Sequence, residues 1–198
     1  MRRKGEICDT DNSLLCVVGS RDNFGETEER VVLVNERDEP LGTEWKTRAH
    51  IAGALHRAFS VFVLNASGQL LIQRRSLTKY HSRGLWSNTC CGHPRPGETI
   101  EVASTRRLKE EMGFAVKLTE LFGFLYQTKL EDGLSEHEYD HVLLGWFEGV
   151  PTPDPAEVAE WKWVDIPALV KDLKRQPEIY TYWLRIAFDQ FIRAIPIS

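Results

Sequence analysis

The chain has 198 residues, 42% of them hydrophobic and 27% charged, and its formal net charge is −4. This length suits one domain, or one domain with a tail, and the composition is that of an ordinary soluble globular protein. The negative balance argues against electrostatic binding to nucleic acid or to an anionic membrane, and no apolar run reaches the roughly 18 residues of a membrane span. We therefore expect a cytoplasmic protein with neither a nucleic-acid partner nor a membrane span.

The first 29 residues are polar, charged and aperiodic. Such a composition predicts a flexible N-terminal extension over residues 1–29, without a catalytic role, and a folded domain over residues 30–198. The four cysteines make a poor disulfide framework, because two lie in the extension and the others, Cys90 and Cys91, are adjacent. Free thiols are therefore expected.

Strand signals dominate the first half of the domain. β-branched and apolar runs predict strands, while clusters of Asp, Asn, Gly and Pro predict turns. A turn is expected at 38–42, a short helix or an irregular segment at 44–52, and a polar loop at 76–85. The expected strands are 31–35, 59–64, 70–74 and 85–91.

The second half begins with a helix expected over residues 99–112. Its apolar residues fall near one face at helical spacing, and Thr99 and Gly113 suit its N-cap and C-cap. This mixture of strands and helices predicts an α+β fold, an α/β sandwich in which helices flank a mixed sheet. The remaining elements are strands within 115–130, 138–148 and 161–164, and helices near 166–174 and 180–194.

A glycine-rich loop followed by an acidic helix makes up the densest motif. Its spacing matches the Nudix box, a strand–loop–helix in which helix carboxylates hold a divalent cation against a diphosphate. Arg107 stands where the Nudix pattern has a Glu. An arginine cannot bind the metal but can hold a phosphate, so part of the hydrolytic metal cluster is missing. The matching residues are Gly92, Glu98, Arg106, Glu110, Glu111 and Gly113.

Taken alone, this helix could equally be an ordinary amphipathic helix whose surface Arg–Glu pairs contribute at most about 0.3–0.5 kcal/mol each. The Cys-Gly-His-Pro sequence at 91–94, directly before the box, is instead similar to the type 1 isopentenyl-diphosphate isomerases. The resemblance covers residues 31–195 and implies a Nudix-type catalytic domain. The implied reaction converts isopentenyl diphosphate into dimethylallyl diphosphate by a metal-dependent 1,3 proton shift. Further matching segments are 49–50, 56–60, 74–79, 86–88, 136–138 and 161–165.

Histidine and glutamate residues at the family positions suggest a metal site. Glu136 and Glu138 alternate on an expected strand, so both point to one face and His137 points away. A single histidine here would more often be a structural residue, but three imidazoles and two carboxylates could fill most of an octahedral shell around Mn²⁺, Mg²⁺ or Zn²⁺. The ligands that the resemblance implies are His50, His56, His93, Glu136 and Glu138.

A diphosphate site is implied by the same resemblance. Glu111 matches the family residue that helps to hold a second cation, Mg²⁺, against the substrate diphosphate. Arg74 is expected to alternate away from Arg75 on its strand. Without the resemblance, each basic residue would be an ordinary solvated surface charge. The implied diphosphate contacts are Lys46, Arg75, Lys79 and Arg107.

The resemblance assigns the acid–base pair to Cys91 and Glu138, on opposite faces of the alkene. Tyr126 matches the tyrosine that hydrogen-bonds this glutamate, and Trp163 matches an aromatic residue that faces the cationic carbon. An indole face stabilises a cation by roughly 0.5–2 kcal/mol. Cys90 should point to the other side of its strand, into the core. The sequence leaves open which member of the pair delivers the first proton.

Two other functions fit part of the pattern. A Nudix hydrolase of a nucleoside diphosphate derivative would share the fold, but Arg107 and the Cys91-Gly92-His93 sequence argue against it. A non-catalytic Nudix-like binding module would not require an acid, a base and metal ligands together. The expected partner is a small allylic or homoallylic diphosphate, and the expected assembly is a monomer or a weak homodimer.

Overall fold

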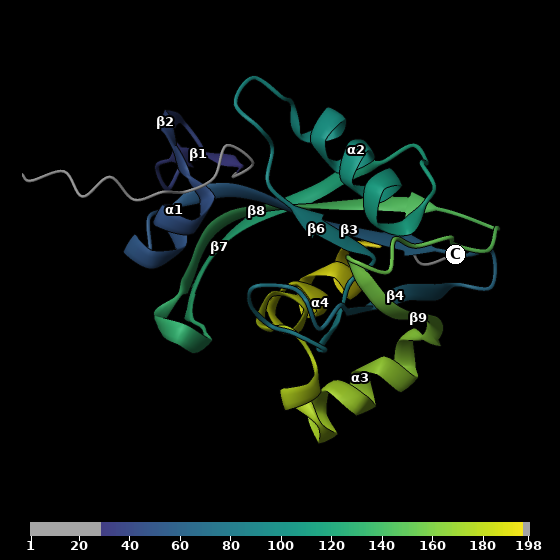
Figure 1. The fold of residues 1–198 in the computed structure, drawn as a ribbon. Helices are drawn as coiled ribbons and strands as arrows, with labels where there is room; N and C mark the ends of the chain where they lie inside the picture. The colour runs from purple at the N-terminus through teal and green to yellow at the C-terminus, as the bar shows by residue number, and fades with distance from the viewer. Residues whose placement is uncertain (1–28, 196–198) are drawn as a thin grey trace, which may run out of the picture.

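A nine-stranded mixed sheet forms the centre of the computed structural model, which describes residues 29–195 (Figure 1). Its main path runs β2-β1-β3-β4-β5; β6 and β8 also pair with β3, β7 pairs with β8, and β9 pairs with β4. The expected extension, apart from Glu29, lies outside the described residues, and so do Cys8 and Cys16. The strands are β1 (Arg30–Val34), β2 (Pro40–Trp45), β3 (His56–Leu64), β4 (Gln69–Arg75), β5 (Trp86–Ser87), β6 (Cys90–Gly92), β7 (Thr119–Lys129), β8 (Ser135–Trp146) and β9 (Val158–Asp165).

Helices cover both faces of this sheet. In Figure 1, α2 lies over one face, α3 and α4 lie under the other, and α1 lies beside β1 and β2. This arrangement confirms the expected α+β sandwich. No helix among the described residues is long and apolar enough to cross a membrane. The helices are α1 (Lys46–Ala52), α2 (Ile100–Met112), α3 (Ile166–Arg175) and α4 (Tyr182–Ala194), with single 3₁₀ turns at Glu131–Gly133 and Pro177–Ile179.

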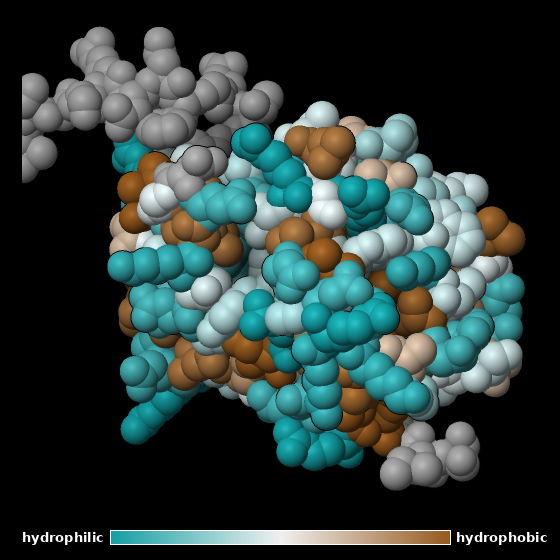
Figure 2. Space-filling view, turned by 90° about the horizontal axis from the view of Figure 1, so that it is seen from below, coloured by the Kyte–Doolittle hydropathy of each residue, from teal (hydrophilic) through white to brown (hydrophobic). Residues whose placement is uncertain are grey.

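Strand β3 is buried on both faces because a helix layer covers each of them. Phe59, Val61 and Val63 pack into the core beneath α2, whereas Phe62 and Leu64 pack into the core against α4. This alternation follows the period of two along a strand. The outer surface on the α3 and α4 side is largely hydrophilic, with smaller separate hydrophobic patches (Figure 2). The core therefore lies in two layers, and β3 separates them.

Helix α2 has the ends that its sequence predicts. The Thr99 side chain accepts a hydrogen bond from the Val102 backbone N–H. Gly113 ends the helix with φ +78°, and its N–H donates to the Lys109 carbonyl. A Cβ at Gly113 would lie 2.3 Å from the Thr152 carbonyl oxygen, so both the backbone angle and the space require glycine.

Two segments differ from the sequence expectation. The expected turn at 38–42 is shorter, because Pro40–Trp45 forms β2 and pairs antiparallel with β1. β2 is an exposed edge strand, where a proline is tolerated and local pattern is weak. The extended segment at 85–91 is divided into β5 and β6, because the Asn88 amide donates to the backbone carbonyls of Val61 and Cys90.

Glu98 fixes the loop that precedes α2. Its two carboxylate oxygens accept from Arg106 Nε at 2.9 Å and Nη2 at 2.8 Å, and one of them also accepts from the Arg95 backbone N–H. The hydrogen bond from Arg106 holds the pKa of Glu98 below its usual range. The loop and the helix are therefore joined by an ion pair that requires an ionised carboxylate.

Glu98→Gln is expected to lower the free energy of unfolding by about 1 kcal/mol at pH 7, and by much less near pH 3. Because the folded pKa lies below the unfolded value of about 4.3, the stabilisation is present above that pH and is lost as the pH falls through the folded pKa. Urea unfolding of the parent and the variant at both pH values measures the difference. Glu101→Gln, at an exposed position of the same helix, is the control, and an equal loss for Glu98→Gln at both pH values would contradict the assignment.

Candidate active site

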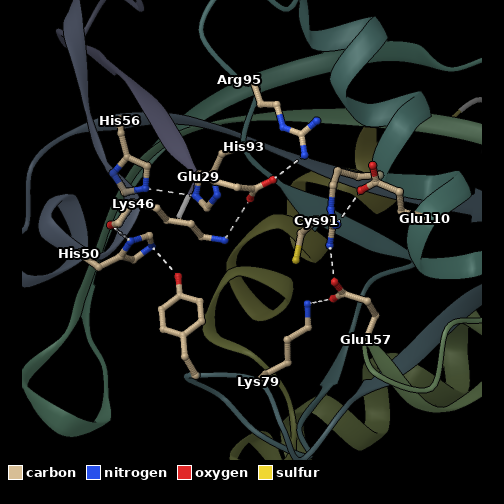
Figure 3. Close-up of polar contacts among 12 residues, drawn as sticks. Glu29, Lys46, His50, His56, Lys79, Cys91, His93, Arg95, Glu110 and Glu157 are labelled. Atoms are coloured by element: carbon tan, nitrogen blue, oxygen red, sulfur yellow. Dashed lines mark hydrogen bonds and ion pairs between the residues drawn. The ribbon is translucent and has the colours of Figure 1, made fainter. Parts of the chain in front are cut away.

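A cleft opens beside the sheet where β3, β6 and β8 meet the loop at 76–85. It holds about 560 Å³ of empty space, open solvent at its mouth included, which is within the usual range for small-molecule sites. Imidazole, carboxylate and cationic side chains line it. Figure 3 shows Lys46 next to the imidazoles and Lys79 next to Glu157. Its uncharged wall is formed by Ala58, Phe59, Ser60, Tyr80, Gly92, Tyr126 and Trp183.

The five residues expected to bind a metal come together in one cluster, and three of them, His93, Glu136 and Glu138, line this cleft. His50 is supplied by α1, His56 begins β3, His93 follows β6, and Glu136 and Glu138 alternate along β8. Glu138 lies directly beside His56 in the parallel pairing of β3 with β8. One ligand atom from each residue lies within 4.8 Å of the others, and four of the five residues are buried. This cluster is assembled from α1, β3, β8 and the residue after β6, which are distant in sequence.

The donor set suits a divalent cation. The Nδ1 atoms of His50 and His56 donate to the carbonyls of Lys46 at 2.6 Å and Ala54 at 2.8 Å, so Nε2 is the nitrogen of each ring that faces the cluster. His56 Nε2 and His93 Nε2 face each other at 3.2 Å. Such a pair of imidazole nitrogens and the neighbouring carboxylates can share one cation. The cluster can therefore hold a metal ion.

Charge within the cluster is distributed unevenly. Burial and the nearby cations hold the pKa of His93 well below its usual range, so its ring is neutral and able to act as a ligand. Burial opposes ionisation of Glu138, but His56 and a hydrogen bond from Tyr126 outweigh it and hold the pKa of Glu138 below its usual range. The Tyr126 hydroxyl donates to Glu138 Oε2 at 2.6 Å. Glu138 is therefore an ionised carboxylate.

Cys91 faces the cleft, and its neighbour Cys90 does not. Cys91 pairs with Ser60 across β3 and β6, and it lies between the imidazoles and Lys79 in Figure 3. Cys90 is fully buried in the core beneath α2, which confirms the expected alternation. Burial raises the pKa of the Cys91 thiol to about 12, although the cation of Arg75 opposes it. Cys91 therefore holds its proton at neutral pH.

Four cationic side chains, those expected to contact a diphosphate, also line the cleft. Arg75 is buried, whereas Arg74 is exposed, as the strand alternation predicts. Lys79 and Arg107 both pair with Glu157, and Arg107 also pairs with Glu111. Positive charge is thus gathered around a space large enough for a small anion. The four residues are Lys46, Arg75, Lys79 and Arg107.

Two carboxylates accompany these cations. Glu111 is buried, and its oxygens accept hydrogen bonds from Arg107 and Gln73; it lines the cleft but lies outside the five-residue cluster. Glu29, the last residue of the expected extension, also lines the cleft. Its carboxylate accepts from Arg95 Nη2 at 3.0 Å and lies 4.0 Å from Lys46 Nζ. A bound anion would therefore meet an acidic side chain at this mouth.

The tryptophan that lines the cleft is not the one expected. Trp163 lies on β9, packs against the core beneath α2 and is not one of the residues that line the cleft. Trp183, in the first turn of α4, lines the cleft and lies under the Arg75 guanidinium, 5.2 Å from the ring centroid. The sequence also gave no reason to select His81, which is buried against Glu136. An aromatic residue close to Arg75 could be recognised only after α4 had been placed against the sheet.

Comparisons with known proteins agree with this geometry. The NUDIX domain model matches residues 54–184. A protein of Aromatoleum aromaticum named isopentenyl-diphosphate Delta-isomerase 2 is 49% identical over 83% of this chain and 87% of its own. The isopentenyl-diphosphate Delta-isomerase of Burkholderia multivorans is 49% identical over 82% of this chain and 93% of its own. The chain belongs to the isopentenyl-diphosphate Delta-isomerase family.

Solved structures place this isopentenyl-diphosphate Delta-isomerase family member within the wider Nudix fold. A crystal structure from Deinococcus radiodurans has a TM-score of 0.69 at 23% identity, over 82% of this chain and 98% of that one. A MutT NUDIX hydrolase from Burkholderia pseudomallei has a TM-score of 0.55 at 24% identity, over 69% and 97%. At these identities the likeness shows the fold alone, and the expected Nudix fold is confirmed.

Proposed function

We propose that the chain interconverts isopentenyl diphosphate and dimethylallyl diphosphate by a 1,3 proton shift. The observation that carries this proposal is the pairing of a protonated thiol, Cys91, with an ionised carboxylate, Glu138, in one cleft lined with cations. Protonation of the terminal alkene carbon would leave a tertiary cation. Loss of a proton from the neighbouring methylene carbon would then give the trisubstituted alkene. One proton enters and one leaves, so the pair needs no external oxidant or reductant.

The cationic part of the cleft would bind the diphosphate and fix the alkene against the acid–base pair. Arg107 and Lys79 carry the charge and are held by Glu157, so they are oriented before a ligand arrives. Tyr126 would steady Glu138 through its hydroxyl hydrogen bond. The buried position of the site would keep water away from the cationic intermediate. We assign this chemistry to the domain that begins at residue 30.

Two cations complete the proposal. His50, His56, His93, Glu136 and Glu138 would hold Mn²⁺, Mg²⁺ or Zn²⁺, and Glu111 would contact a Mg²⁺ that accompanies the diphosphate. A divalent ion at the histidine cluster supplies positive charge next to Glu138 and keeps its carboxylate ionised. The buried carboxylates and the inward-facing Nε2 atoms support this assignment.

Trp183, rather than Trp163, would face the cationic carbon. Its ring borders the cleft and already lies beside a guanidinium. Trp183→Leu is expected to lower kcat on the order of 30-fold, which corresponds to about 2 kcal/mol of lost cation–π stabilisation. Trp183→Phe should lose less, and Trp163→Phe, which changes the core beneath α2, should leave kcat unchanged. Equal losses for Trp183→Leu and Trp163→Leu would contradict the assignment.

Hydrolysis of a nucleoside diphosphate derivative is the weaker alternative. Arg107 occupies a metal-binding position of the Nudix pattern and pairs with Glu110 and Glu111. Those carboxylates are therefore neutralised by a side chain, which reduces what they offer to a hydrolytic metal cluster. Release of phosphate or of a nucleoside monophosphate from nucleotide substrates would favour this alternative.

The deciding experiment is incubation with isopentenyl diphosphate, Mg²⁺ and Mn²⁺ in D₂O. Dimethylallyl diphosphate that carries one deuterium in its new methyl group is the expected product, read by NMR and mass spectrometry. The same incubation with nucleoside diphosphate derivatives tests hydrolysis. Unlabelled substrate recovered without product, under conditions in which the protein is folded and holds metal, would overturn the proposal.

A further inference from the structure

The loop at 76–85 contributes a buried histidine beside the metal cluster. His81 is 7% exposed and lines the cleft. Its Nε2 lies 3.3 Å from Glu136 Oε1, and the other Glu136 oxygen lies 3.1 Å from His50 Nε2. Glu136 is therefore contacted by a different imidazole at each oxygen. Among the described residues, the metal cluster itself does not include His81.

One tautomer of the His81 ring suits both of its polar contacts. Its Nδ1 lies 3.2 Å from the Ser82 hydroxyl, which can donate to it, and Nε2 can then carry the proton on the side of Glu136. A polar side chain that contacts a carboxylate ligand is the usual second contact of a metal site.

The backbone of the same loop residue also contacts Arg75, one of the four cationic residues that line the cleft. The His81 backbone carbonyl accepts from Arg75 Nη2 at 3.2 Å, and the Ser82 carbonyl accepts from Arg75 Nε at 3.2 Å. Arg75 is thus held by the backbone of the loop whose side chain holds Glu136. Lys79 lies two residues earlier in this loop and lines the same cleft.

We propose that His81 is a positioning residue of the metal centre, whose Nε2, 3.3 Å from Glu136 Oε1, makes a polar contact that orients the other carboxylate oxygen toward the ion. The proposal rests on the proposed metal site and does not depend on which reaction the cleft catalyses. The contact between His81 and Glu136 also attaches the loop that carries Lys79 to the metal cluster. Loss of such a second contact typically weakens metal binding by about 10–100-fold.

A packing role for His81 makes different predictions. Its ring lies 4.3 Å from the Tyr80 ring and 5.9 Å from the Trp183 ring, so an aromatic replacement would preserve much of the packing. His81→Phe keeps a ring and removes the donor. His81→Gln keeps an N–H donor of similar reach, whereas His81→Asn is chemically alike but too short to reach Glu136. Comparison of the parent with these three variants separates hydrogen-bond donation by the side chain at position 81 from its packing.

The test is Mn²⁺ binding to the full-length, metal-stripped protein, measured by calorimetry and by the electron paramagnetic resonance signal of free Mn²⁺. His81→Phe and His81→Asn are expected to raise Kd by about 10–100-fold, and His81→Gln by no more than about threefold. Leu77→Ala, at an exposed position of the same loop, is the control and should bind as the parent does. Melting of the metal-free proteins checks that each variant is folded.

Parent-like Mn²⁺ affinity in His81→Phe or His81→Asn would overturn the proposal, and so would equal losses in His81→Gln and His81→Asn. If His81→Phe does not fold, the comparison of His81→Gln with His81→Asn still tests the proposal, because the two amide side chains differ only in length. Binding is measured without substrate, so it can support His81 even if the parent fails to isomerise isopentenyl diphosphate. If the parent protein isomerises isopentenyl diphosphate, His81→Asn should reach the kcat of the parent once Mn²⁺ is saturating. Its KM for isopentenyl diphosphate should equal that of the parent.

Discussion

Cys91→Ala is expected to lower kcat for isopentenyl diphosphate by about 10²–10⁴-fold, the usual contribution of a positioned acid or base. The thiol holds its proton at neutral pH because burial raises its pKa to about 12. Removing the sulfur leaves Glu138 without a partner that can complete the proton shift. The KM should change little, since the cations that would bind the diphosphate are untouched. Steady-state kinetics with a coupled or NMR assay measures both constants.

Cys90→Ala is the matched control for this substitution. It removes the same atom from the adjacent residue, which is fully buried in the core beneath α2. The cost should be about 1 kcal/mol of stability, with activity unchanged. If Cys91→Ala isomerises at the rate of the parent, or if the two variants lose activity equally, Cys91 does not carry the proton.

Removal of divalent metal is expected to abolish isomerase activity and to lower Tm. The five clustered side chains are mostly buried, and two of them are carboxylates whose charge a bound ion would offset. Mn²⁺ at about 100 times its Kd would restore about 2.7 kcal/mol of stability, which is a Tm increase of about 5–10 °C for a domain of this size. Dialysis against a chelator, followed by thermal melts and assays with added Mn²⁺, Mg²⁺ or Zn²⁺, measures both effects and ranks the ions.

Two substitutions make this metal experiment specific. His93→Gln should lose most of the Mn²⁺-dependent increase in Tm, because its Nε2 lies within the cluster. His141→Gln should keep the increase: His141 lies on β8 too, but its nitrogens contact Asp38 and Glu120 outside the cluster. An increase retained by His93→Gln and lost by His141→Gln would place the ion elsewhere.

Local pattern predicted those features that depend on neighbouring residues. The caps of α2 follow from the residue types at its two ends, Thr99 and Gly113. The opposite orientations of Cys90 and Cys91, and those of Arg74 and Arg75, follow from the period of a strand. Strand β2 was missed because it is stabilised by pairing with β1, and its own residues carry a weak strand signal.

Side chains that approach through tertiary packing were harder to predict. Both Trp163 and Trp183 lie in segments rich in aromatic residues, and only the docking of α4 brings Trp183 to the cleft while Trp163 packs beneath α2. His81 belongs to a polar loop without periodicity, so its contact with Glu136 has no signature in the sequence. The five clustered residues were found by resemblance to a family, since spacing alone does not join α1, β3, β6 and β8.

The central position of β3 also determines how the site can form during folding. β3 pairs with β6 and, in parallel, with β8, so His56, Cys91 and Glu138 become neighbours only after segments about 80 residues apart have joined. Long-range parallel pairing is slow compared with helix formation or hairpin closure. Metal affinity and catalytic competence should therefore arise together, late in refolding, and a partly folded chain should possess neither.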